Sequence, residues 1–455
     1  MAVLGHRRPP WHQVRGHDRR CTAAARAHAA GRPRVVYRRR VVRQTFDRSP
    51  WSLDPEVSFL NHGSFGACPA PVLEAQRAWR DRLEAEPVRF FERELEPLLD
   101  AVRAEVGEFL NADPDGIAFV PNTTAGVSTV LASLRFAPGD ELLAGDHEYN
   151  ATLNALRAAA ERDGASVVVC HIPFPIHDPA QAVEAYLEAV TPRTRLALVS
   201  QVTSPTALVL PVAVLVRELD RRGVDTLVDG AHAPGMVPVD LEAVGAAWWT
   251  GNGHKWLCAP KGAAILHARA DKRDRLRPLA VSHGFNDERV DRPRYRRLFD
   301  WTGTVDYSPY LSLSAAIRFV GALHPDGWPG LMADNAALAR QARDRVCAAL
   351  GTAQPAPDSM LGSMAAIPLP GLAPTPEAAR RLHDQLFDEE RIEVPIVPFP
   401  VPAALAPGAG PSAVLVRISA QRYNEPGEYA ALASALAVRL LGPAKPRSLL
   451  GRLRR

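Results

Sequence analysis

The sequence predicts an α/β fold with a mainly parallel sheet of about seven strands, joined to a small C-terminal α+β domain. Short, wholly apolar runs alternate with amphipathic helical stretches over most of the chain. This alternation is typical of a parallel sheet covered by helices on both faces. Polar motifs follow most of the apolar runs. Because such sheets bind ligands beyond the carboxyl ends of their strands, these motifs are the candidates for a functional site.

Two domains and two basic ends are expected. The chain has 455 residues, of which 47% are hydrophobic, and this is enough to bury one large and one smaller core. We place the large domain at 49–320 and the small one at 321–442. Residues 1–48 are arginine-rich and acid-poor, which is typical of a polyanion-binding tail or a targeting peptide. The alternatives are a solvated, disordered extension or translation from an upstream start codon. We expect a disordered extension there and a basic tail at 443–455.

The composition disfavours several classes of protein. The five cysteines are scattered and form no Cys-x-x-Cys pair, so neither a disulfide framework nor a zinc site is expected. No apolar run approaches the roughly 18 to 20 residues of a membrane span, and the N-terminus lacks the apolar segment of a secretory signal. We therefore expect a cytoplasmic protein with no metal, no membrane partner and no nucleic-acid partner.

The large domain is expected to begin with two amphipathic helices, at 72–86 and 97–110, the second with a proline suited to its first turn. Further helices are expected at 150–164 and 212–223, each closed by a glycine that is typical of a helix C-cap. The strands are expected at the runs IAFV (from 117), ELLAG (from 141), SVVVCHI (from 166), RLALVSQV (from 195), DTLVDG (from 225), AAWWTG (from 246) and AAILHA (from 263).

The small domain is expected to contain a helix at 375–390, which begins with a threonine cap and a proline. The stretch 392–399 is interrupted by prolines and therefore predicts an edge strand, because proline cannot donate a ladder hydrogen bond. A loop rich in proline, glycine and alanine is expected at 402–412 and a strand at 413–419. The segment EYAALASALAVRLL predicts a closing helix.

Lys255 and Asp229 are the first candidate site residues. Lys255 lies in an apolar stretch flanked by glycines, where a lysine can be neutral and nucleophilic, ready to form a Schiff base. Asp229 ends an apolar strand one strand earlier, where a carboxylate needs a partner; bonding of local turn amides is the alternative role. A ligand with a cationic ring nitrogen facing Asp229 and a carbonyl facing Lys255 would satisfy both side chains.

The motif PNTTAG predicts an anion site. It places Asn122, Thr123 and Thr124 between a strand and a helix, where free backbone amides and the helix dipole favour a phosphate; a simple helix cap is the alternative. The motif is neither a Walker loop nor a dinucleotide-binding loop. The stretch HGSFGA also lacks the Gly-x-Ser-x-Gly of serine hydrolases.

Eight motifs between residues 59 and 428 resemble those of one known family. They are FLNHGSFGACP (59–69), NTTAG (122–126), DHEYNATL (146–153), SPTALVLPV (204–212), VDGAHAPGMVPVDL (228–241), GNGHKWLCAPKG (251–262), WTGTVD (301–306) and VRISAQRYNEPGE (416–428). In this order they look like the class V aminotransferase superfamily of fold type I pyridoxal-phosphate enzymes, and within it most like isopenicillin N epimerase-like proteins. The resemblance covers about Trp51 to Leu441. It implies pyridoxal 5'-phosphate as cofactor, with segment 49–70 contributing to the active site.

The resemblance implies a role for each candidate residue. Lys255 would hold the cofactor covalently and then carry the proton at the substrate's α-carbon, while Asp229 would pair with the pyridinium nitrogen. Tyr149 would stack on the cofactor, and His232 and Thr203 would lie near its phenolic oxygen. The residues implied to bind the cofactor phosphate are Thr123, Thr124, Asn252 and His254, with Asn122 in the same motif.

The resemblance also implies a substrate site and a homodimer. Arg417, in the middle of an apolar strand, would clamp the carboxylate of a small amino acid or peptide substrate. Asn61 and His62 are expected to contact the substrate. Thr304, in WTGT, is similar to a threonine that reaches the phosphate of a partner subunit, and this implies the homodimer.

Two departures from the family pattern concern the substrate rather than the cofactor. Gln201 stands where relatives often have histidine, and the segment 287–300 is unusually rich in arginine. Both are expected to line or flank the substrate region.

The sequence identifies the reaction less well than the cofactor. We expect epimerisation at the α-carbon of an amino acid or aminoadipyl peptide, which needs a second acid besides Lys255; Tyr149 and His62 are the candidates. A carbon–sulfur lyase and a class V aminotransferase are the alternatives. No cysteine lies in a segment resembling a desulfurase nucleophile, and Cys258 is expected to pack in the core. A non-catalytic polyanion-binding protein is disfavoured, because the basic arm lacks the interleaved aromatic residues of a stacking surface.

Overall fold

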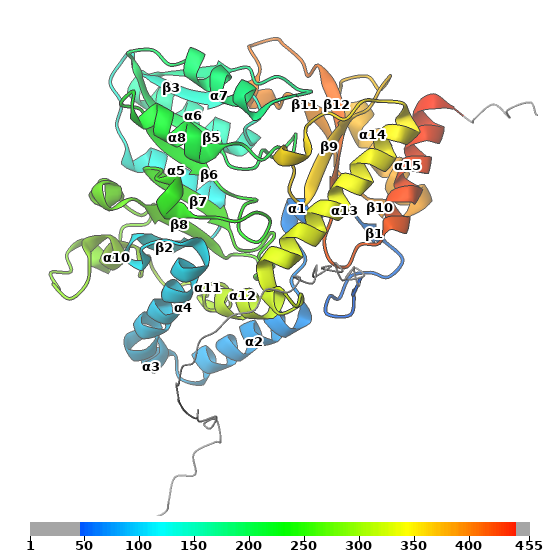
Figure 1. Ribbon diagram of the computed structural model, residues 1–455. Helices are drawn as coiled ribbons and strands as arrows, with labels where there is room; N and C mark the ends of the chain where they lie inside the picture. The colour runs from blue at the N-terminus through cyan, green and yellow to red at the C-terminus, as the bar shows by residue number, and fades with distance from the viewer. Residues whose placement is uncertain (1–45, 443–455) are drawn as a thin grey trace, which may run out of the picture. The chain divides into compact units, whose positions relative to one another are not determined.

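A seven-stranded sheet dominates the computed structural model, which describes residues 46–442 (Figure 1). Its strands lie in the order β2-β8-β7-β6-β5-β3-β4. Their bounds are β2 (Ile117–Val120), β3 (Glu141–Gly145), β4 (Ser166–Cys170), β5 (Thr194–Ser200), β6 (Asp225–Asp229), β7 (Trp248–Asn252) and β8 (Ala264–Ala268). Strands β3 to β7 pair in parallel, and β8 runs antiparallel to both of its neighbours. The predicted α/β fold with a mainly parallel sheet is confirmed.

Helices cover both faces of this sheet because successive residues of a strand point to opposite sides. In β3, Leu142 packs into one apolar cluster and Leu143 into another, and β7 divides Trp248 and Trp249 in the same way. Both tryptophans are fully buried. The helices between the strands are α5 (Thr123–Ser133), α6 (Asn150–Asp163), α7 (Pro179–Glu188), α8 (Val212–Asp220) and α9 (Leu241–Val244).

Further helices lie before β2 and after β8. Those before β2 are α1 (His62–Phe65), α2 (Ala70–Ala85), α3 (Pro87–Arg89), the π-helical turn η1 (Phe90–Glu94), α4 (Leu95–Leu110) and the 3₁₀ turn η2 (Pro114–Gly116). Those after β8 are η3 (Ala270–Arg275), η4 (His283–Phe285), α10 (Arg294–Phe299), α11 (Ser308–Leu311), α12 (Leu313–Gly321) and α13 (Gly327–Leu350). Helices α2 and α4 correspond to the first two predicted helices.

A second, three-stranded antiparallel sheet has the order β11-β12-β9. Its strands are β9 (Met364–Pro368), β11 (Ile396–Phe399) and β12 (Ala413–Ser419). Helices α13 and α14 (Pro376–Glu390) pack against it, and α15 (Pro426–Leu441) packs on α13 (Figure 1). The short turns η5 (Asp358–Met360) and η6 (Pro402–Ala404) complete this part. Strand β11, which contains Pro398, is an edge strand as its prolines predict.

The segment that precedes α2 is anchored to the small sheet. Strand β1 (Ser58–Phe59) pairs in parallel with β10 (Ile392–Glu393). The Ser419 amide donates to the Leu60 carbonyl oxygen at 2.9 Å, and the Gly63 amide donates to the Ser419 hydroxyl at 3.0 Å. Residues 58–66 are therefore held by β10 and by β12, the strand that carries Arg417.

Some expectations fall beyond what the structure describes. The tail at 443–455 and all but the last three residues of the 1–48 extension lie outside the described residues, and the domain boundary near residue 320 stays a prediction. Within residues 46–442, no helix is both long and apolar enough to cross a bilayer. In the same part of the chain, no three histidine, cysteine or acidic side chains gather closely enough to hold a metal ion.

Candidate active site

A pocket of about 340 Å³ lies where β5, β6 and β7 end. The final residues of these three strands, Ser200, Asp229 and Asn252, all line it. Its other lining residues are Ser64, Phe65, Pro121, Asn122, Thr123, Thr124, Tyr149, Val202, Ser204, Ala231, His232, His254, Lys255, Lys261 and Gly262. The pocket therefore collects the loops that follow neighbouring strands, together with the α1 segment from the N-terminal side.

Asp229 is a buried carboxyl at the base of the pocket. It pairs with Ser200 on one side and Thr250 on the other, in the parallel register of β5, β6 and β7. Its Oδ1 accepts a hydrogen bond of 2.9 Å from the Ala231 amide. Burial raises the pKa of Asp229, whereas the Ala231 amide and the charge of Lys255 act in the opposite direction. A cationic group beside this carboxyl would stabilise its ionised form.

Lys255 lies in the turn that follows β7. Burial, together with the charge of Arg417, lowers the pKa of Lys255 to about 7. Its Nζ lies 3.2 Å from His232 Nε2, while Trp256 Nε1 donates to His232 Nδ1 at 3.4 Å. Because the indole can only donate, neutral His232 carries its proton on Nε2 and donates it toward Nζ. Burial lowers the pKa of His232 well below its usual value, so this arrangement favours an uncharged, nucleophilic amine.

The N-terminal end of α5 forms the polar end of the pocket. Asn122 Oδ1 accepts from the Ala125 amide at 2.8 Å, so Asn122 is the helix cap. Asn252 Oδ1 accepts from the Thr123 amide at 2.9 Å and so fixes the first turn. Thr123 Oγ1 and His254 Nδ1 are buried without a hydrogen-bond partner among the described residues. Two unsatisfied polar atoms beside a helix N-terminus fit the phosphate that the sequence predicts.

Arg417 reaches the pocket wall from β12 of the small sheet. Its Nη2 donates to Ser64 Oγ at 2.9 Å and its Nη1 to the Ser204 carbonyl oxygen at 2.6 Å, and both serines line the pocket. Its Nε is buried and unsatisfied among the described residues. Burial lowers the pKa of Arg417 to about 10, which leaves the guanidinium charged at neutral pH. An anionic substrate group would find a preformed cation there.

Thr203 does not face the pocket, and Ser204 takes its place. Thr203 is fully buried; its Oγ1 lies 2.7 Å from Thr206 Oγ1 and accepts from the Leu208 amide at 2.8 Å. The expectation that Thr203 lies near a ligand oxygen is therefore wrong, because the next residue, Ser204, lines the pocket instead. The local turn points Thr203 into the core and Ser204 outward.

Asn61 and His62 support the pocket from behind instead of lining it. His62 is fully buried, with Nδ1 2.8 Å from Tyr423 Oη and Nε2 3.0 Å from the Lys255 carbonyl oxygen. Asn61 donates to Glu393 Oε1 at 2.8 Å and accepts from Ser64 Oγ. We therefore correct the expected substrate contacts of both residues to structural contacts with the Lys255 turn and with Ser64.

Gly66, which follows α1, packs directly on the Lys255 turn. It has a φ of +66°, and a Cβ added at this position would lie only 2.2 Å from the His254 carbonyl oxygen. The side chains of Ser64, Phe65 and Lys261 meet in the same area, and Lys261 Nζ donates to the Gly66 carbonyl oxygen at 2.6 Å. Sequence reasoning missed these lining residues, although the glycines of HGSFG and APKG mark both places of close approach.

Thr304 is exposed and does not line the pocket of its own chain. Gln201 is also absent from the pocket: it is buried and its Oε1 accepts from Trp249 Nε1 at 2.9 Å. The expected place of Gln201 beside the substrate is therefore corrected to a position in the core.

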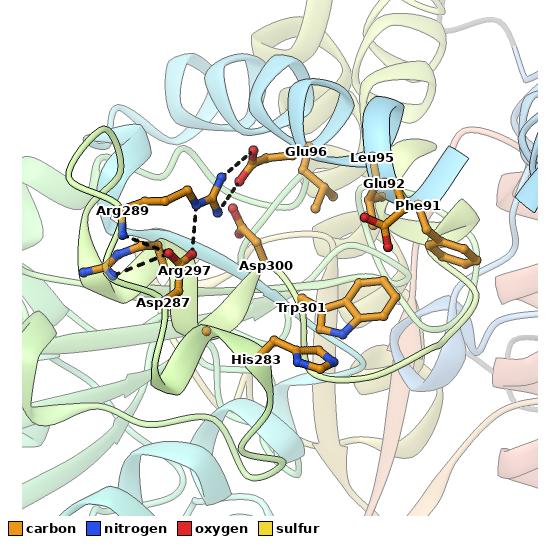
Figure 2. Close-up of a pocket in the computed structure, with 12 residues that line it drawn as sticks. Phe91, Glu92, Leu95, Glu96, His283, Asp287, Arg289, Arg297, Asp300 and Trp301 are labelled. Atoms are coloured by element: carbon orange, nitrogen blue, oxygen red, sulfur yellow. Dashed lines mark hydrogen bonds and ion pairs between the residues drawn. The ribbon is translucent and has the colours of Figure 1, made fainter. Parts of the chain in front are cut away.

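The arginine-rich segment 287–300 lines a different cavity, of about 490 Å³, which Figure 2 shows. There Arg289 bonds both Glu96 and Asp287, and Arg297 faces Asp287. Further ion pairs of the segment join Arg292 to Glu96, Asp100 and Asp300, and Arg296 to Asp100, Asp115 and Asp300. Within one chain these arginines pair with acids and do not reach the Lys255 pocket, so their expected place beside the substrate is corrected to an ion-pair network.

Comparisons with known proteins agree with this geometry. The Aminotransferase class-V family model matches residues 67–379. An isopenicillin N epimerase from Amycolatopsis lactamdurans is 37% identical over 401 residues, which cover 86% of this chain and 96% of that protein. A probable chloroplastic L-cysteine desulfhydrase from Arabidopsis thaliana is 31% identical, over 84% of this chain and 83% of that protein. A solved structure of a C-DES mutant, with glycine covalently linked to the PLP cofactor, superposes with a TM-score of 0.70 at 22% identity, covering 86% of this chain and 99% of that one.

Proposed function

We propose, from the premise that this chain belongs to the aminotransferase class-V family, that it is an amino-acid epimerase of the isopenicillin N epimerase type. The chain is a pyridoxal 5'-phosphate-dependent enzyme of this family. The observation that carries the proposed reaction is the 37% identity to an isopenicillin N epimerase over 96% of that protein. The substrate would be an amino acid or an aminoadipyl peptide.

The residues of the pocket would hold the cofactor at three points. The amine of Lys255 would bind its aldehyde carbon, and Asp229 would accept a hydrogen bond from its ring nitrogen. Thr123, Thr124 and His254 would bind its phosphate, with Asn122 and Asn252 fixing the helix turn behind them. When bound, the cofactor withdraws electrons from the substrate and so acidifies its α-proton. Tyr149, which is 47% exposed and lines the pocket, would cover the ring.

The chain's own side chains would then remove the α-proton from one face of the substrate and deliver another proton to the opposite face. Arg417 would bind the substrate carboxylate and fix the α-carbon in the pocket. Lys255, with its pKa of about 7, could both take and return a proton near neutral pH. Of the two candidates for the second acid, Tyr149 lines the pocket whereas His62 is buried behind the Lys255 carbonyl. We therefore assign Tyr149 as the second acid, on the face of the substrate opposite Lys255.

The proposal is tested by incubating the holoenzyme in D₂O with L-amino acids and an aminoadipyl peptide. The expected result is α-deuterium together with appearance of the D epimer. Tyr149→Phe should retain exchange into the L form but lose inversion by at least about 100-fold, because only the second acid is missing. Lys255→Ala serves as the control and should abolish both. Absence of exchange into every substrate would overturn the proposal.

A carbon–sulfur lyase is the second candidate, because relatives about 31% identical are L-cysteine desulfhydrases. Loss of a β-substituent uses the same acidified α-carbon and needs no protein thiol. None of the described cysteines lines the pocket, and burial raises the pKa of Cys258 far above its usual value and that of Cys68 to about 12. This argues against a desulfurase nucleophile. Release of sulfide and pyruvate from L-cysteine without α-epimerisation would favour the lyase, and conversion of the cofactor to its amine form would favour a transaminase.

We further propose that the enzyme is a cytoplasmic homodimer. The support is Thr304, which is exposed and does not line its own pocket, and whose motif resembles one that reaches a partner's phosphate. The mass of the holoenzyme in solution tests the dimer, and Thr304→Ala should weaken cofactor binding without changing that mass. A monomeric holoenzyme would refute it.

A further inference from the structure

Glu148 is a fully buried acid directly behind the pocket wall. It follows β3, and its Oε1 accepts from the Ser200 amide at 2.8 Å and from Tyr186 Oη at 2.9 Å. Its Oε2 makes a short hydrogen bond with Ser200 Oγ. Among the described residues no arginine, lysine or histidine forms an ion pair with it. A buried carboxyl whose partners are all neutral is costly to ionise.

Two residues next to Glu148 belong to the pocket. Ser200 ends β5 and lies in register with Asp229, the last residue of β6, and both line the pocket. Tyr149, the next residue in the chain, lines the pocket as well. The environment of Glu148 therefore acts on both the base and the wall of the cofactor site.

The groups around Glu148 favour its neutral form. Burial raises the pKa of Glu148 to about 8, and the nearby Asp229 charge adds to this, while its hydrogen bonds act in the opposite direction. The other titratable groups that face it are Tyr186 and Cys170, and burial raises the pKa of both. These two stay protonated at neutral pH, so Asp229 is the negative charge that acts on Glu148. The Asp146 carboxylate, which acts on Cys170, is paired with His171.

The direction of each hydrogen bond follows from this count of protons. The Tyr186 hydroxyl has one hydrogen and two acceptors within reach, Glu148 Oε1 at 2.9 Å and the Leu198 carbonyl oxygen at 3.1 Å. The Ser200 amide always donates to Oε1, so we place the proton of neutral Glu148 on Oε2, where it faces Ser200 Oγ. A serine oxygen that accepts from Glu148 is free to donate its own hydrogen elsewhere. The space next to it is the pocket.

We propose that Glu148 is a positioning residue of the cofactor pocket: as a neutral acid it donates to Ser200 and so directs the Ser200 hydroxyl into the pocket beside Asp229. Asp229 is the one acid among the described residues that line this pocket. Ionised Glu148 would instead accept the Ser200 hydrogen and withdraw it from the pocket. The inference depends on the proposed cofactor contacts but not on which reaction follows.

The test measures cofactor affinity against pH after resolution of the holoenzyme and retitration with pyridoxal 5'-phosphate. Glu148→Gln mimics the neutral acid at every pH, because its amide donates to Ser200 Oγ and its carbonyl accepts. At pH 7 we expect wild type and E148Q to bind the cofactor with equal dissociation constants. At pH 9.5 the wild-type protein should bind it at least about threefold more weakly than E148Q, which is the effect of one lost hydrogen bond. A ratio that does not change with pH, or an E148Q protein about tenfold weaker at pH 7, would overturn the inference.

Ser200→Ala gives a second readout, at the hydrogen-bond partner of Glu148. Without the hydroxyl, the affinity of S200A and of S200A/E148Q should follow the same pH profile, and a difference that persists between them would refute the role of Ser200. Infrared difference spectra of the holoenzymes give a third readout. At pH 7 the spectrum of wild type minus that of E148Q should show the band of a protonated carboxyl group. Glu161→Gln, an exposed position on α6, is the control and should leave that band unchanged. Absence of the band at pH 7 would overturn the inference, and none of these measurements requires turnover.

Discussion

Gly66→Ala tests how closely the α1 segment supports the Lys255 turn. Gly66 has φ +66° and ψ 141°, a backbone conformation nearly confined to glycine, which costs other residues about 1–3 kcal/mol. The new Cβ would also lie 2.2 Å from the His254 carbonyl oxygen and 2.7 Å from that of Lys255. Overpacking of this kind costs about 1–3 kcal/mol more. The free energy of unfolding should therefore fall by about 2–6 kcal/mol, a large part of the roughly 5–15 kcal/mol of a typical protein.

Gly139→Ala is the matched control, because Gly139 has φ +89° and no atom within 4 Å of an added Cβ. It carries the backbone strain without the contact. Urea unfolding of both holoenzymes should show Gly66→Ala to be less stable than the control by at least about 1 kcal/mol. Its cofactor absorbance per chain should also fall, because the displaced carbonyls belong to the turn of Lys255. Equal stability losses with full cofactor content in both variants would contradict the described contact.

The remaining predictions concern two basic side chains, Lys255 and Arg417. In the unfolded chain Lys255 keeps its proton up to its ordinary pKa of 10.5, whereas in the folded apo protein its pKa is about 7. Between these pH values the unfolded state binds more protons, so the free energy of unfolding should rise with pH. From pH 7 to 10, the free energy of unfolding of wild-type apo protein in urea should rise by on the order of 4 kcal/mol more than that of Lys255→Met. If the two free energies changed with pH in parallel, the low pKa of Lys255 would be contradicted. Arg417→Gln should weaken amino-acid binding in spectral titrations about 10- to 100-fold, whereas the exposed Arg381→Gln should not, and equal affinities would exclude the carboxylate contact.

The sequence predicts the large sheet well because each strand has an apolar centre, such as LL in β3, LALV in β5 or LV in β6, and ends at polar or glycine residues. Its limits appear where the local signal is short or mixed. Strand β1 has two residues, and β9 contains two alanines and a proline, so neither stands out as a strand. Helix α13 begins with Gly327, Pro329 and Gly330, which read as loop residues, yet it runs for 24 residues because the later part packs along α15 and the small sheet.

The site shows where sequence reasoning fails at the scale of one residue. Thr203 and Ser204 are adjacent hydroxyl residues, and no periodicity distinguishes them after β5 has ended. Thr203 turns inward to Thr206, which the distant His147 contacts in the core, and this long-range contact is not visible in the sequence. Glu148 and His62 illustrate the other limit: both are polar residues inside recognisable motifs, but only the packing reveals that they are fully buried behind the residues that touch the ligand.

The anchoring of residues 58–66 to β10 and β12 has a consequence for protein engineering. This strap carries Ser64, which accepts a hydrogen bond from Arg417, and Gly66, which packs on the Lys255 turn. Specificity therefore cannot be transplanted between relatives by exchanging the C-terminal sheet alone. A functional chimaera would have to exchange 49–70 and 392–419 together as one cassette, although more than 300 residues of sequence separate them.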